Sequence, residues 1–365
     1  MKLSLITSFL EKIAPLSYQE DYDNSGLIVG HPEKEINGAI ISLDCTEDVV
    51  DEAIEKGFNL IVSHHPIVFK GMKKFTGKNY VERVIIKAIK HDIAIYAIHT
   101  NFDNVLNGVN AKICEVIGLV NCSILSPKIN LLKKLVTYSP AAQAEKVRSA
   151  LFEAGAGDIG NYSECSFNTT GSGTFLAGEN TNPFVGEIGI RHSENEVRIE
   201  TIYPANRERE ILMALHLAHP YEEVAYDLYN LDNKHNQVGS GMIGNLEIEM
   251  DEIQFLNYVK EKLQTDVIRY TRLRNKKVNR VAVCGGSGSF LLANAISAGA
   301  DVFITADYKY HEFFDADKKI VIADVGHFES EQFTQQLLLE IITEKFPNFA
   351  LRLTQQNTNP IKYLI

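Results

Sequence analysis

The sequence contains no long apolar run, no closely spaced pair of cysteines and no excess of positive charge. A membrane-spanning helix needs about 20 consecutive, mostly apolar residues, and no stretch approaches that length, so we expect no membrane partner. Asp and Glu number 47 against 36 Lys and Arg, which gives a formal net charge of −11. This balance argues against a nucleic-acid groove and against a patch for anionic lipids.

The cysteines are five in number, and no two form a CxxC pair. An odd count without paired spacing disfavours both a disulfide framework and a cysteine-rich zinc site. We therefore predict reduced, mostly buried thiols. They are Cys45, Cys114, Cys122, Cys165 and Cys284.

What is present is the composition of a folded protein, with 365 residues, 45% of them hydrophobic and 23% charged. This length favours two or more lobes over one core. Residues 1–15 could be mistaken for a signal peptide, but their apolar residues recur at helical spacing and Glu11 interrupts the run. The pattern predicts an amphipathic helix ending near Pro15 and hence a cytoplasmic protein.

The first and last thirds alternate apolar strands with helices, a pattern typical of a sheet covered on both faces. In the first third, Thr46 and Gly57 are placed to begin and end one helix. Strands are predicted over 37–44, 58–65 and 93–100, and helices over 46–57, 81–92 and 107–117. The last third predicts helices over 251–264, 289–299 and 329–345, and strands over 279–286, 300–307, 319–326 and 349–355.

The middle of the chain has a different order of elements. It predicts a strand over 134–139, a helix over 141–154, a Gly/Asn/Ser/Thr-rich stretch over 155–182, strands near 185–191 and 196–202, a helix over 206–217 and a strand over 222–231. This order is the ferredoxin-like plan. We therefore predict an α/β main domain, residues 1–132 and 232–365, interrupted by an α+β insert, residues 133–231.

Two adjacent histidines, His64 and His65, end an apolar strand and are followed at once by Pro66. Neighbouring residues within a strand point to opposite faces. At a strand end, where proline forces an irregular exit, both side chains can point into the crevice where open α/β sheets bind ligands.

The next predicted strand ends in the polar run 99–104, which contains His99 and Asp103. Asn and Asp also close turns and cap helices, so Asp103 alone would be read as a turn residue.

A third polar segment, residues 326–332, follows the strand predicted over 319–326. His327 and Glu331 are four residues apart, so in a helix they would face the same way. Glu329 lies on another face, where its charge suits a helix N-terminus.

Each of these side chains follows a predicted parallel strand, so we expect them on one rim of the sheet. Imidazoles and carboxylates without thiolates suit zinc, manganese, iron, cobalt or nickel. Five ligands exceed what one catalytic zinc needs and suit two metals about 3.5–4 Å apart. Spacing alone leaves both a mononuclear and a dinuclear site open. The five residues are His64, His65, Asp103, His327 and Glu331.

Two further features are ambiguous. The turn Gly285–Gly288 could offer backbone N–H groups to phosphate, or could simply be a tight turn with close packing. Asp307 and His311 follow another strand, where a helix cap and a group supporting a ligand are as plausible as a catalytic role.

With these segments identified, the chain resembles the GTP cyclohydrolase 1 type 2 homologue family, also called the Ngg-interacting-factor-three-like family. Tyr22 stands where the family usually has Trp, and Ala306 where it has Gly; neither is a predicted ligand. The matching blocks occur in family order: YDNSGLIVG (22–30), SHHPIVFKG (63–71), AIHTNFDN (97–104), GGSGSFL (285–291), GADVFITAD (299–307) and DVGHFESEQ (324–332).

The resemblance implies that the five residues named above bind two divalent cations per subunit, with Glu331 bridging them. Zinc is our first choice and manganese, iron or cobalt are alternatives. It also implies a homohexamer with sites facing an internal cavity, and an insert similar to PII and CutA proteins, in which HPYEE (219–223) is similar to a CutA block.

The family name implies hydrolytic opening of the purine ring of GTP, for which a metal-bound hydroxide is chemically suited. On this hypothesis the substrate is GTP or a related nucleotide or phosphoester, and His99 is a catalytic proton shuttle or, alternatively, a support for the ligands. The competing hypothesis is a non-enzymatic regulatory protein whose insert senses a small molecule.

Overall fold

The computed structural model describes residues 1–364 and divides the chain into two compact units. The first unit combines Met1–Pro127 with the chain from Gln237 on, and the second is Lys128–Asn236. Each has a buried apolar cluster of its own. The chain therefore leaves the first unit once and returns to it.

The first unit contains two sheets, where the sequence led us to expect one. The five-stranded sheet has the order β1-β4-β3-β2-β15, and β1 alone runs antiparallel to its neighbour. Its strands are β1 (Gly26–Val29), β2 (Gly38–Ser42), β3 (Leu60–Ser63), β4 (Ala94–Ala97) and β15 (Ala350–Leu353). Strand β15 comes from the far end of the chain and pairs with β2, so both chain thirds build this sheet.

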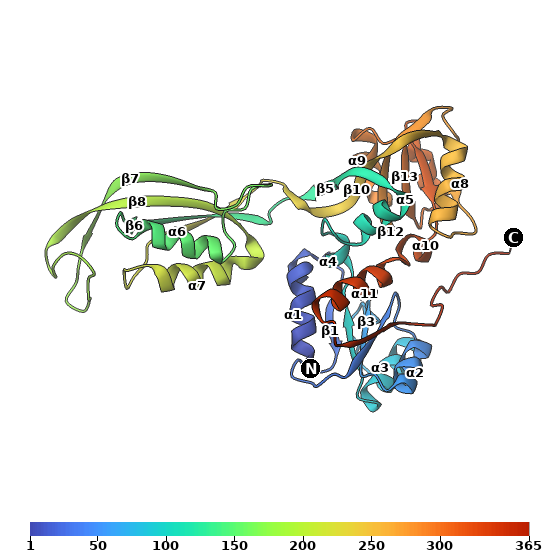
Figure 1. The fold of residues 1–365 in the computed structure, drawn as a ribbon, viewed down its shortest axis with the longest axis horizontal. Helices are drawn as coiled ribbons and strands as arrows, with labels where there is room; N and C mark the ends of the chain where they lie inside the picture. The colour runs from blue at the N-terminus through green and yellow to red at the C-terminus, as the bar shows by residue number, and fades with distance from the viewer. Residues whose placement is uncertain (365) are drawn as a thin grey trace. The chain divides into compact units, whose positions relative to one another are not determined.

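Helices cover both faces of this sheet, as the continuous apolar strands predicted. Ile95 packs with α2 (Glu47–Lys56) and α3 (Tyr80–Lys90), while Tyr96, on the opposite face, reaches α1 (Leu3–Ile13) through Glu11 (Figure 1). The local signals for α2 are confirmed, because the Thr46 side chain caps its first turn and Gly57 ends it at φ 68°.

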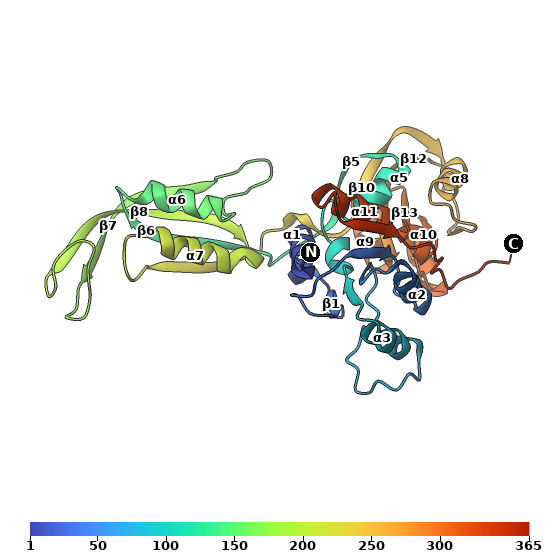
Figure 2. The ribbon, with the colours of Figure 1, turned by 60° about the horizontal axis from the view of Figure 1, so that its bottom comes forward.

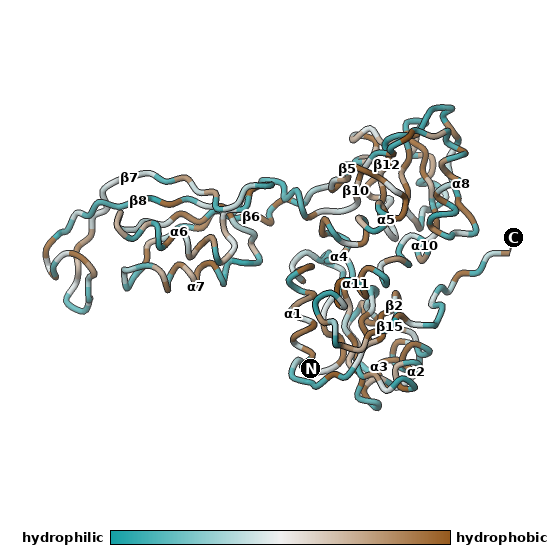
Figure 3. The backbone as a smooth tube through the Cα atoms, viewed as in Figure 1, coloured by the Kyte–Doolittle hydropathy of each residue, from teal (hydrophilic) through white to brown (hydrophobic). Residues whose placement is uncertain are grey.

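The second sheet has six strands in the order β11-β14-β13-β12-β10-β5. The central strands β12, β13 and β14 are parallel, whereas β10 runs antiparallel to β12 and β11 runs antiparallel to β14. Its strands are β5 (Leu119–Lys128), β10 (His235–Asp251), β11 (Arg269–Tyr270), β12 (Lys277–Ser287), β13 (Val302–Ala306) and β14 (Val321–Asp324). The chain is hydrophobic along its central strands (Figure 3). Local sequence patterns identify such strands but not the sheet in which each one pairs.

The remaining elements of this unit are short or connect the sheets. The single helix predicted over 329–345 is two helices in the structure, α10 (His327–Glu331) and α11 (Thr334–Lys345). The sequence does not reveal the break, because the apolar periodicity continues through it. The others are η1 (Leu16–Tyr18), α4 (Thr100–Asp103), α5 (Val109–Ile117), α8 (Glu252–Lys262), η3 (Ser289–Leu291), α9 (Leu292–Ser297) and η4 (Tyr310–Ala316).

Strands β5 and β10 are not predicted from the sequence. In β10, glycines interrupt the apolar pattern. Gly239 is required there, since a Cβ atom at this position would lie 2.2 Å from the Ser126 carbonyl oxygen. The glycine that weakens the strand signal is thus the residue that lets the two backbones approach.

The second unit is an antiparallel sheet of four strands in the order β7-β8-β6-β9. Helices α6 and α7 lie side by side along it (Figures 1 and 2) and bury Leu135 and Ile199 on one face of the sheet. The elements are β6 (Leu132–Pro140), α6 (Ala144–Glu153), β7 (Ser166–Leu176), β8 (Arg191–Pro204), η2 (Ala205–Arg207), α7 (Glu208–Ala218) and β9 (Tyr226–Leu231).

Strand β7 corrects one prediction. The sequence predicts this strand near 185–191, whereas the structure places it at Ser166–Leu176, inside the Gly/Asn/Ser/Thr-rich stretch. The strand lies at the edge of the sheet and most of its side chains are exposed. An edge strand held by backbone pairing carries little of the apolar alternation on which sequence recognition depends.

All five cysteines lie within the described residues and are free, and three of them are buried. This confirms the expected thiols. Among residues 1–364, no helix is both long and apolar enough to cross a membrane.

We predict that replacing residues 128–236 with a short Gly/Ser linker leaves a soluble protein, because each unit buries its own core. Circular dichroism should show a folded product, and elemental analysis should find the same metal content per chain as in the full-length protein. Insoluble, metal-free protein would indicate instead that the two units form one continuous core.

Candidate metal centre

The predicted ligands come from the carboxyl ends of strands in both sheets. His64 and His65 follow β3, and Asp103 ends α4, which begins just after β4. His327 and Glu331 belong to α10, which follows β14 of the second sheet. The five side chains therefore meet between two sheets, which corrects the expectation of a site on one rim.

Glu331 lies at the centre of this group, and its side chain is only 3% exposed. Its Oε2 atom lies 3.0 Å from Nε2 of His65 and 3.1 Å from Nε2 of His327. Its Oε1 atom lies 3.9 Å from Nε2 of His64. The two carboxylate oxygens thus face two different groups of side chains.

Two sets of three potential ligands share Glu331. One adds His64 and Asp103, and the other adds His65 and His327; within each set the ligand atoms lie within 4.8 Å of one another. The Nε2 atom of His64 lies 3.5 Å from Oδ1 of Asp103. A carboxylate between two such sets is the arrangement expected of a bridging ligand.

In the first set, two buried atoms lack any hydrogen-bond partner. They are Nε2 of His64 and Oδ1 of Asp103. A buried polar atom without a partner costs on the order of 1–3 kcal/mol. A cation between these atoms would remove that cost, so the donor set fits a divalent metal.

The Nδ1 atoms of the three candidate ligand histidines all face hydrogen-bond acceptors. His64 donates to the carbonyl oxygen of Ile98 at 2.8 Å, and His65 and His327 donate to Asp44 at 2.8 Å and to Asp307 at 2.6 Å. With Nδ1 as the donor, the neutral ring has its lone pair on Nε2, which points at Glu331. Acceptors of this kind orient histidines that bind metals.

In the second set, this orientation makes three acceptors converge. Nε2 of His65 and Nε2 of His327 lie 3.3 Å apart, and both face Oε2 of Glu331. Three acceptors in contact are stable only with protons or a cation among them. This set therefore also fits a cation.

The pKa values follow from the same contacts. Burial lowers the pKa of His64 to about 3, so its ring is neutral. Burial acts in the same direction on His65, but hydrogen bonds to Asp44 and Glu331 outweigh it and raise the pKa of His65 to about 9. For His327, Glu331 and Asp307 likewise outweigh burial and raise the pKa to about 11.

The two carboxyl groups differ in the same way. Burial, reinforced by the charge of Glu331, raises the pKa of Asp103 well above its ordinary value. Burial would also raise the pKa of Glu331, but His327 and His65 outweigh it and hold that pKa well below its ordinary value. Glu331 is therefore the permanent negative charge of the centre.

His99 lies beside the ligands without belonging to the two sets that share Glu331. Its ring centroid is 5.2 Å from that of His64 and 5.3 Å from that of His65. Its Nδ1 atom donates to Oδ1 of Asp23 at 2.8 Å. His99 also forms a third possible ligand group with His64 and His65.

Sequence reasoning missed Asp44 and Asp23 and left the role of Asp307 open. Asp44 ends a predicted apolar strand, a signal as strong as the one used for Asp103. Asp23 lies in the block YDNSGLIVG, which was used only for the family resemblance. Asp307 contacts His327, whereas His311 is exposed and stacks on Phe314, away from the ligands.

The C-terminal segment also contacts the centre, a feature no motif indicated. Thr358 donates to Oδ2 of Asp44 at 2.7 Å, and Asn359 donates to Oε1 of Glu329 at 3.0 Å. Both residues line the cavity of about 800 Å³ that contains the ligands.

The turn Gly285–Gly288 packs closely, which is the second of its two interpretations. The N–H group of Gly285 donates to Asn110 and that of Gly286 donates to Ser330, each at 3.0 Å. These two donors are therefore used within the chain. Gly286 has φ 59°, and a Cβ atom there would lie 2.5 Å from Oε1 of Glu331.

We predict that Gly286→Ala lowers the metal content of the purified protein to less than half, because the new methyl group displaces Glu331. Gly299→Ala is the matched control: Gly299 has φ 75° and no atom within 4 Å of a Cβ. In both variants the free energy of unfolding should fall by about 1–2 kcal/mol, because alanine is disfavoured in the left-handed backbone conformation. Thermal unfolding and elemental analysis separate the two effects, and equal metal content in both variants would refute the steric account.

Comparison with known proteins gives a consistent result along the whole chain. Residues 1–360 match Duf34/NIF3 (NGG1p interacting factor 3). A Bacillus subtilis (strain 168) protein named GTP cyclohydrolase 1 type 2 homolog is 36% identical over 369 residues, and the match covers 98% of each chain. A protein of the same name from Halalkalibacterium halodurans is 37% identical over 364 residues, again covering 98% of each.

Solved structures agree. The crystal structure of a Bacillus cereus protein related to NIF3 superposes with a TM-score of 0.87 at 40% identity, covering 100% of this chain and 99% of the other. A Staphylococcus aureus protein superposes with a TM-score of 0.80 at 31% identity, with the same coverage. These matches confirm the resemblance drawn from the sequence. The chain belongs to the Duf34/NIF3 (NGG1p interacting factor 3) family.

Proposed function

We propose that the protein is a hydrolase that depends on two divalent cations, zinc first among them, with manganese, iron or cobalt as alternatives. His64 and Asp103 would hold one ion, His65 and His327 the other, and Glu331 would bridge them. The observation that carries the proposal is the division of the Glu331 oxygens between two sets of ligand atoms.

Divalent cations at such a site lower the pKa of a water molecule toward neutrality and polarise the bond to be cleaved. Two of them would add four positive charges against the carboxylates of Asp103 and Glu331, a formal local charge of about +2. A phosphate-bearing substrate thus suits the centre, although the chain as a whole carries a formal charge of −11.

The proposed substrate is GTP or a related nucleotide or phosphoester. The name of the relatives supports this choice, and the cavity of about 800 Å³ has the size of a small-molecule site. Tyr22, Phe69 and Phe290 line that cavity and are each at least 49% exposed. Their rings offer stacking surfaces for a purine.

We assign His99 the transfer of a proton between substrate and solvent. Asp23 accepts from Nδ1 of His99, which leaves Nε2 for the substrate side. Hydrogen bonds from His99, Thr100 and Asn24 outweigh burial and lower the pKa of Asp23, so this carboxylate stays charged and holds the ring in place. Such an orienting pair is typical of general acid–base catalysts.

We further propose that residues 128–236 form the ferredoxin-like insert predicted for 133–231. The supports are the element order and the strand order β7-β8-β6-β9. From the family resemblance we propose a PII- and CutA-like origin for this insert, a cytoplasmic protein and a homohexamer. Native mass spectrometry would test the hexamer, which a purely monomeric species would contradict.

The alternative function is a non-enzymatic metal-binding regulator whose insert senses a small molecule. One observation favours it: the second unit has its own cavity of about 610 Å³. On this alternative the metals organise the protein, and no substrate is turned over at the centre.

The test of the hydrolase is incubation of the metal-loaded protein with GTP and measurement of formate release. We expect turnover with at least one of zinc, manganese, iron and cobalt. Glu331→Gln should abolish both turnover and metal content, whereas Glu344→Gln, an exposed glutamate on α11, should change neither. No turnover with any of the four metals would favour the regulator.

For His99, we predict that His99→Ala lowers kcat about 10²–10⁴-fold with unchanged metal content, and that added imidazole restores part of the rate. His91→Ala, at an exposed histidine that ends α3, is the matched control. Loss of metal together with activity would make His99 a ligand or a supporting residue.

A further inference from the structure

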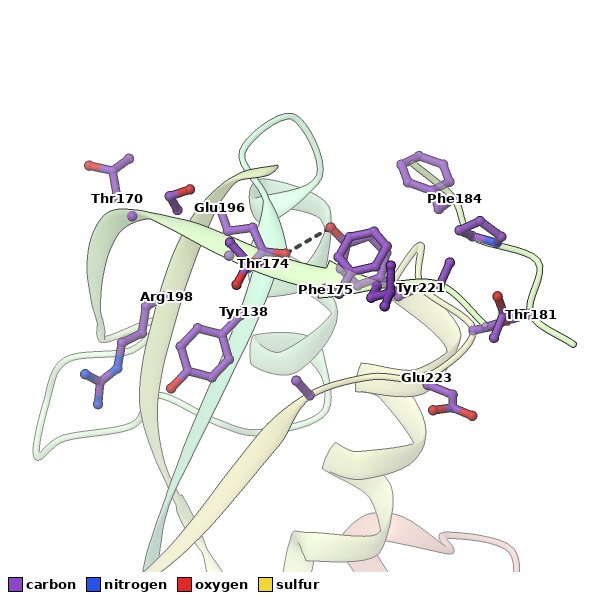
Figure 4. Close-up of a pocket in the computed structure, with 18 of the residues that line it drawn as sticks. Tyr138, Thr170, Thr174, Phe175, Thr181, Phe184, Glu196, Arg198, Tyr221 and Glu223 are labelled. Atoms are coloured by element: carbon purple, nitrogen blue, oxygen red, sulfur yellow. Dashed lines mark hydrogen bonds between the residues drawn. The ribbon is translucent and has the colours of Figure 1, made fainter. Parts of the chain in front are cut away.

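The second unit contains a cavity of about 610 Å³ on the face of its sheet opposite the helices. Residues alternate in direction along a strand, and Val197 and Ile199 of β8 pack with the helical core. Glu196 and Arg198, on the same strand, therefore face the other way and line the cavity (Figure 4). No predicted metal ligand lines this cavity.

Aromatic rings form one wall of the cavity. The ring of Tyr221 lies 6.2 Å from that of Phe175 and 6.4 Å from that of Phe184, measured between centroids. Tyr138 lines the cavity closer to Arg198 (Figure 4). The faces of such rings carry negative electrostatic potential and attract cations.

The charged groups lining the cavity are mostly carboxylates. Glu196, Glu222 and Glu223 contribute three negative charges, and Arg198 contributes the one positive charge. The Arg198 guanidinium lies 3.0 Å from Oε1 of Glu200, whose Oε2 atom also pairs with Lys134 at 3.0 Å, and neither Glu200 nor Lys134 lines the cavity. The lining therefore has a formal charge of −2.

The Glu196 carboxylate accepts a hydrogen bond from Tyr221 and lies close to Gly173. The hydroxyl of Tyr221 donates to its Oε1 atom at 2.9 Å, the contact drawn in Figure 4. Gly173 of β7 leaves room for the carboxylate in this position, since a Cβ atom there would lie 2.0 Å from Oε2 of Glu196. Burial and Glu196 both raise the pKa of Tyr221, which keeps the hydroxyl protonated as a donor.

We propose that this cavity binds a small organic cation that carries a primary or quaternary ammonium group. The volume falls within the range of small-molecule sites, and the aromatic wall beside a fixed carboxylate is the chemistry that recognises ammonium ions. The cation lies against Tyr221 and Phe175 and pairs with Glu196. This site is separate from the metal centre and does not depend on the proposed hydrolase.

The test is isothermal titration of the full-length protein with choline, a quaternary ammonium, and with butylamine, a primary ammonium. We expect saturable binding of at least one of them, one molecule per chain. The uncharged isostere of choline, 3,3-dimethylbutan-1-ol, should bind at least about tenfold more weakly.

Three variants locate the binding site. Glu196→Gln, which keeps an acceptor for Tyr221 and removes the charge, should weaken binding about tenfold or more. Phe175→Ala should weaken it as well. Glu153→Gln makes the same charge change at an exposed position on α6 and should leave the affinity unchanged.

The proposal is overturned if neither ammonium ion binds, if the uncharged isostere binds as tightly as choline, or if Glu196→Gln has no effect. It is also overturned if acetate binds in place of the cations, since Arg198 would then select an anion. Protection of this face by a second copy of the chain, seen as slow hydrogen exchange along β7 only in an oligomer, would assign it to an interface instead. None of these readouts involves activity at the metal centre.

Discussion

The centre depends on one buried carboxylate, that of Glu331, whose two oxygens face different groups of side chains. Glu331 belongs to α10, which follows strand β14 of the second sheet. Its Oε2 atom lies 3.0 Å from Nε2 of His65, which follows strand β3 of the first sheet. A buried carboxylate is costly unless it is paired. His65 and His327 supply that pairing, so the contact that neutralises Glu331 also joins residues more than 260 positions apart in the chain.

Other features of the unit can be understood as support for this contact. Gly286 leaves the space that the carboxylate occupies, and Asp44 and Asp307 direct the two imidazoles toward it. Gly286 lies at the end of β12, and Asp44 and Asp307 follow β2 and β13. All three therefore lie at the carboxyl ends of parallel strands, which is where α/β sheets present functional side chains. The centre is thus assembled from strand ends, with little contribution from helix interiors.

The structure brings together the five side chains that the sequence singled out, and the signal that identified them is local. A polar side chain directly after an apolar strand, as at His64 or Asp103, is visible without knowledge of the fold. The pairing of strands into two sheets is not local, and so the meeting of two sheets at Glu331 was missed. Asp44 gives the same local signal as Asp103, but it stands alone at the end of its strand, whereas Asp103 lies in the polar run 99–104 beside His99. A single carboxylate after a strand also suits a turn.

The insert shows the same division between local and non-local information. Its element order was predicted from periodicity, but β7 was placed about twenty residues too late, because its exposed Thr and Gly residues lack apolar alternation. Its cavity could not be foreseen at all. Glu196, Gly173 and Tyr221 come from three separate segments, and their relation appears only once β7 is paired with β8.

The most direct test of the account is the position of the metals themselves. Anomalous scattering from crystals grown with zinc should locate two ions about 3.5–4 Å apart, one beside His64 and Asp103 and one beside His65 and His327, with a Glu331 oxygen on each. A single ion, or two ions without Glu331 between them, would contradict the account.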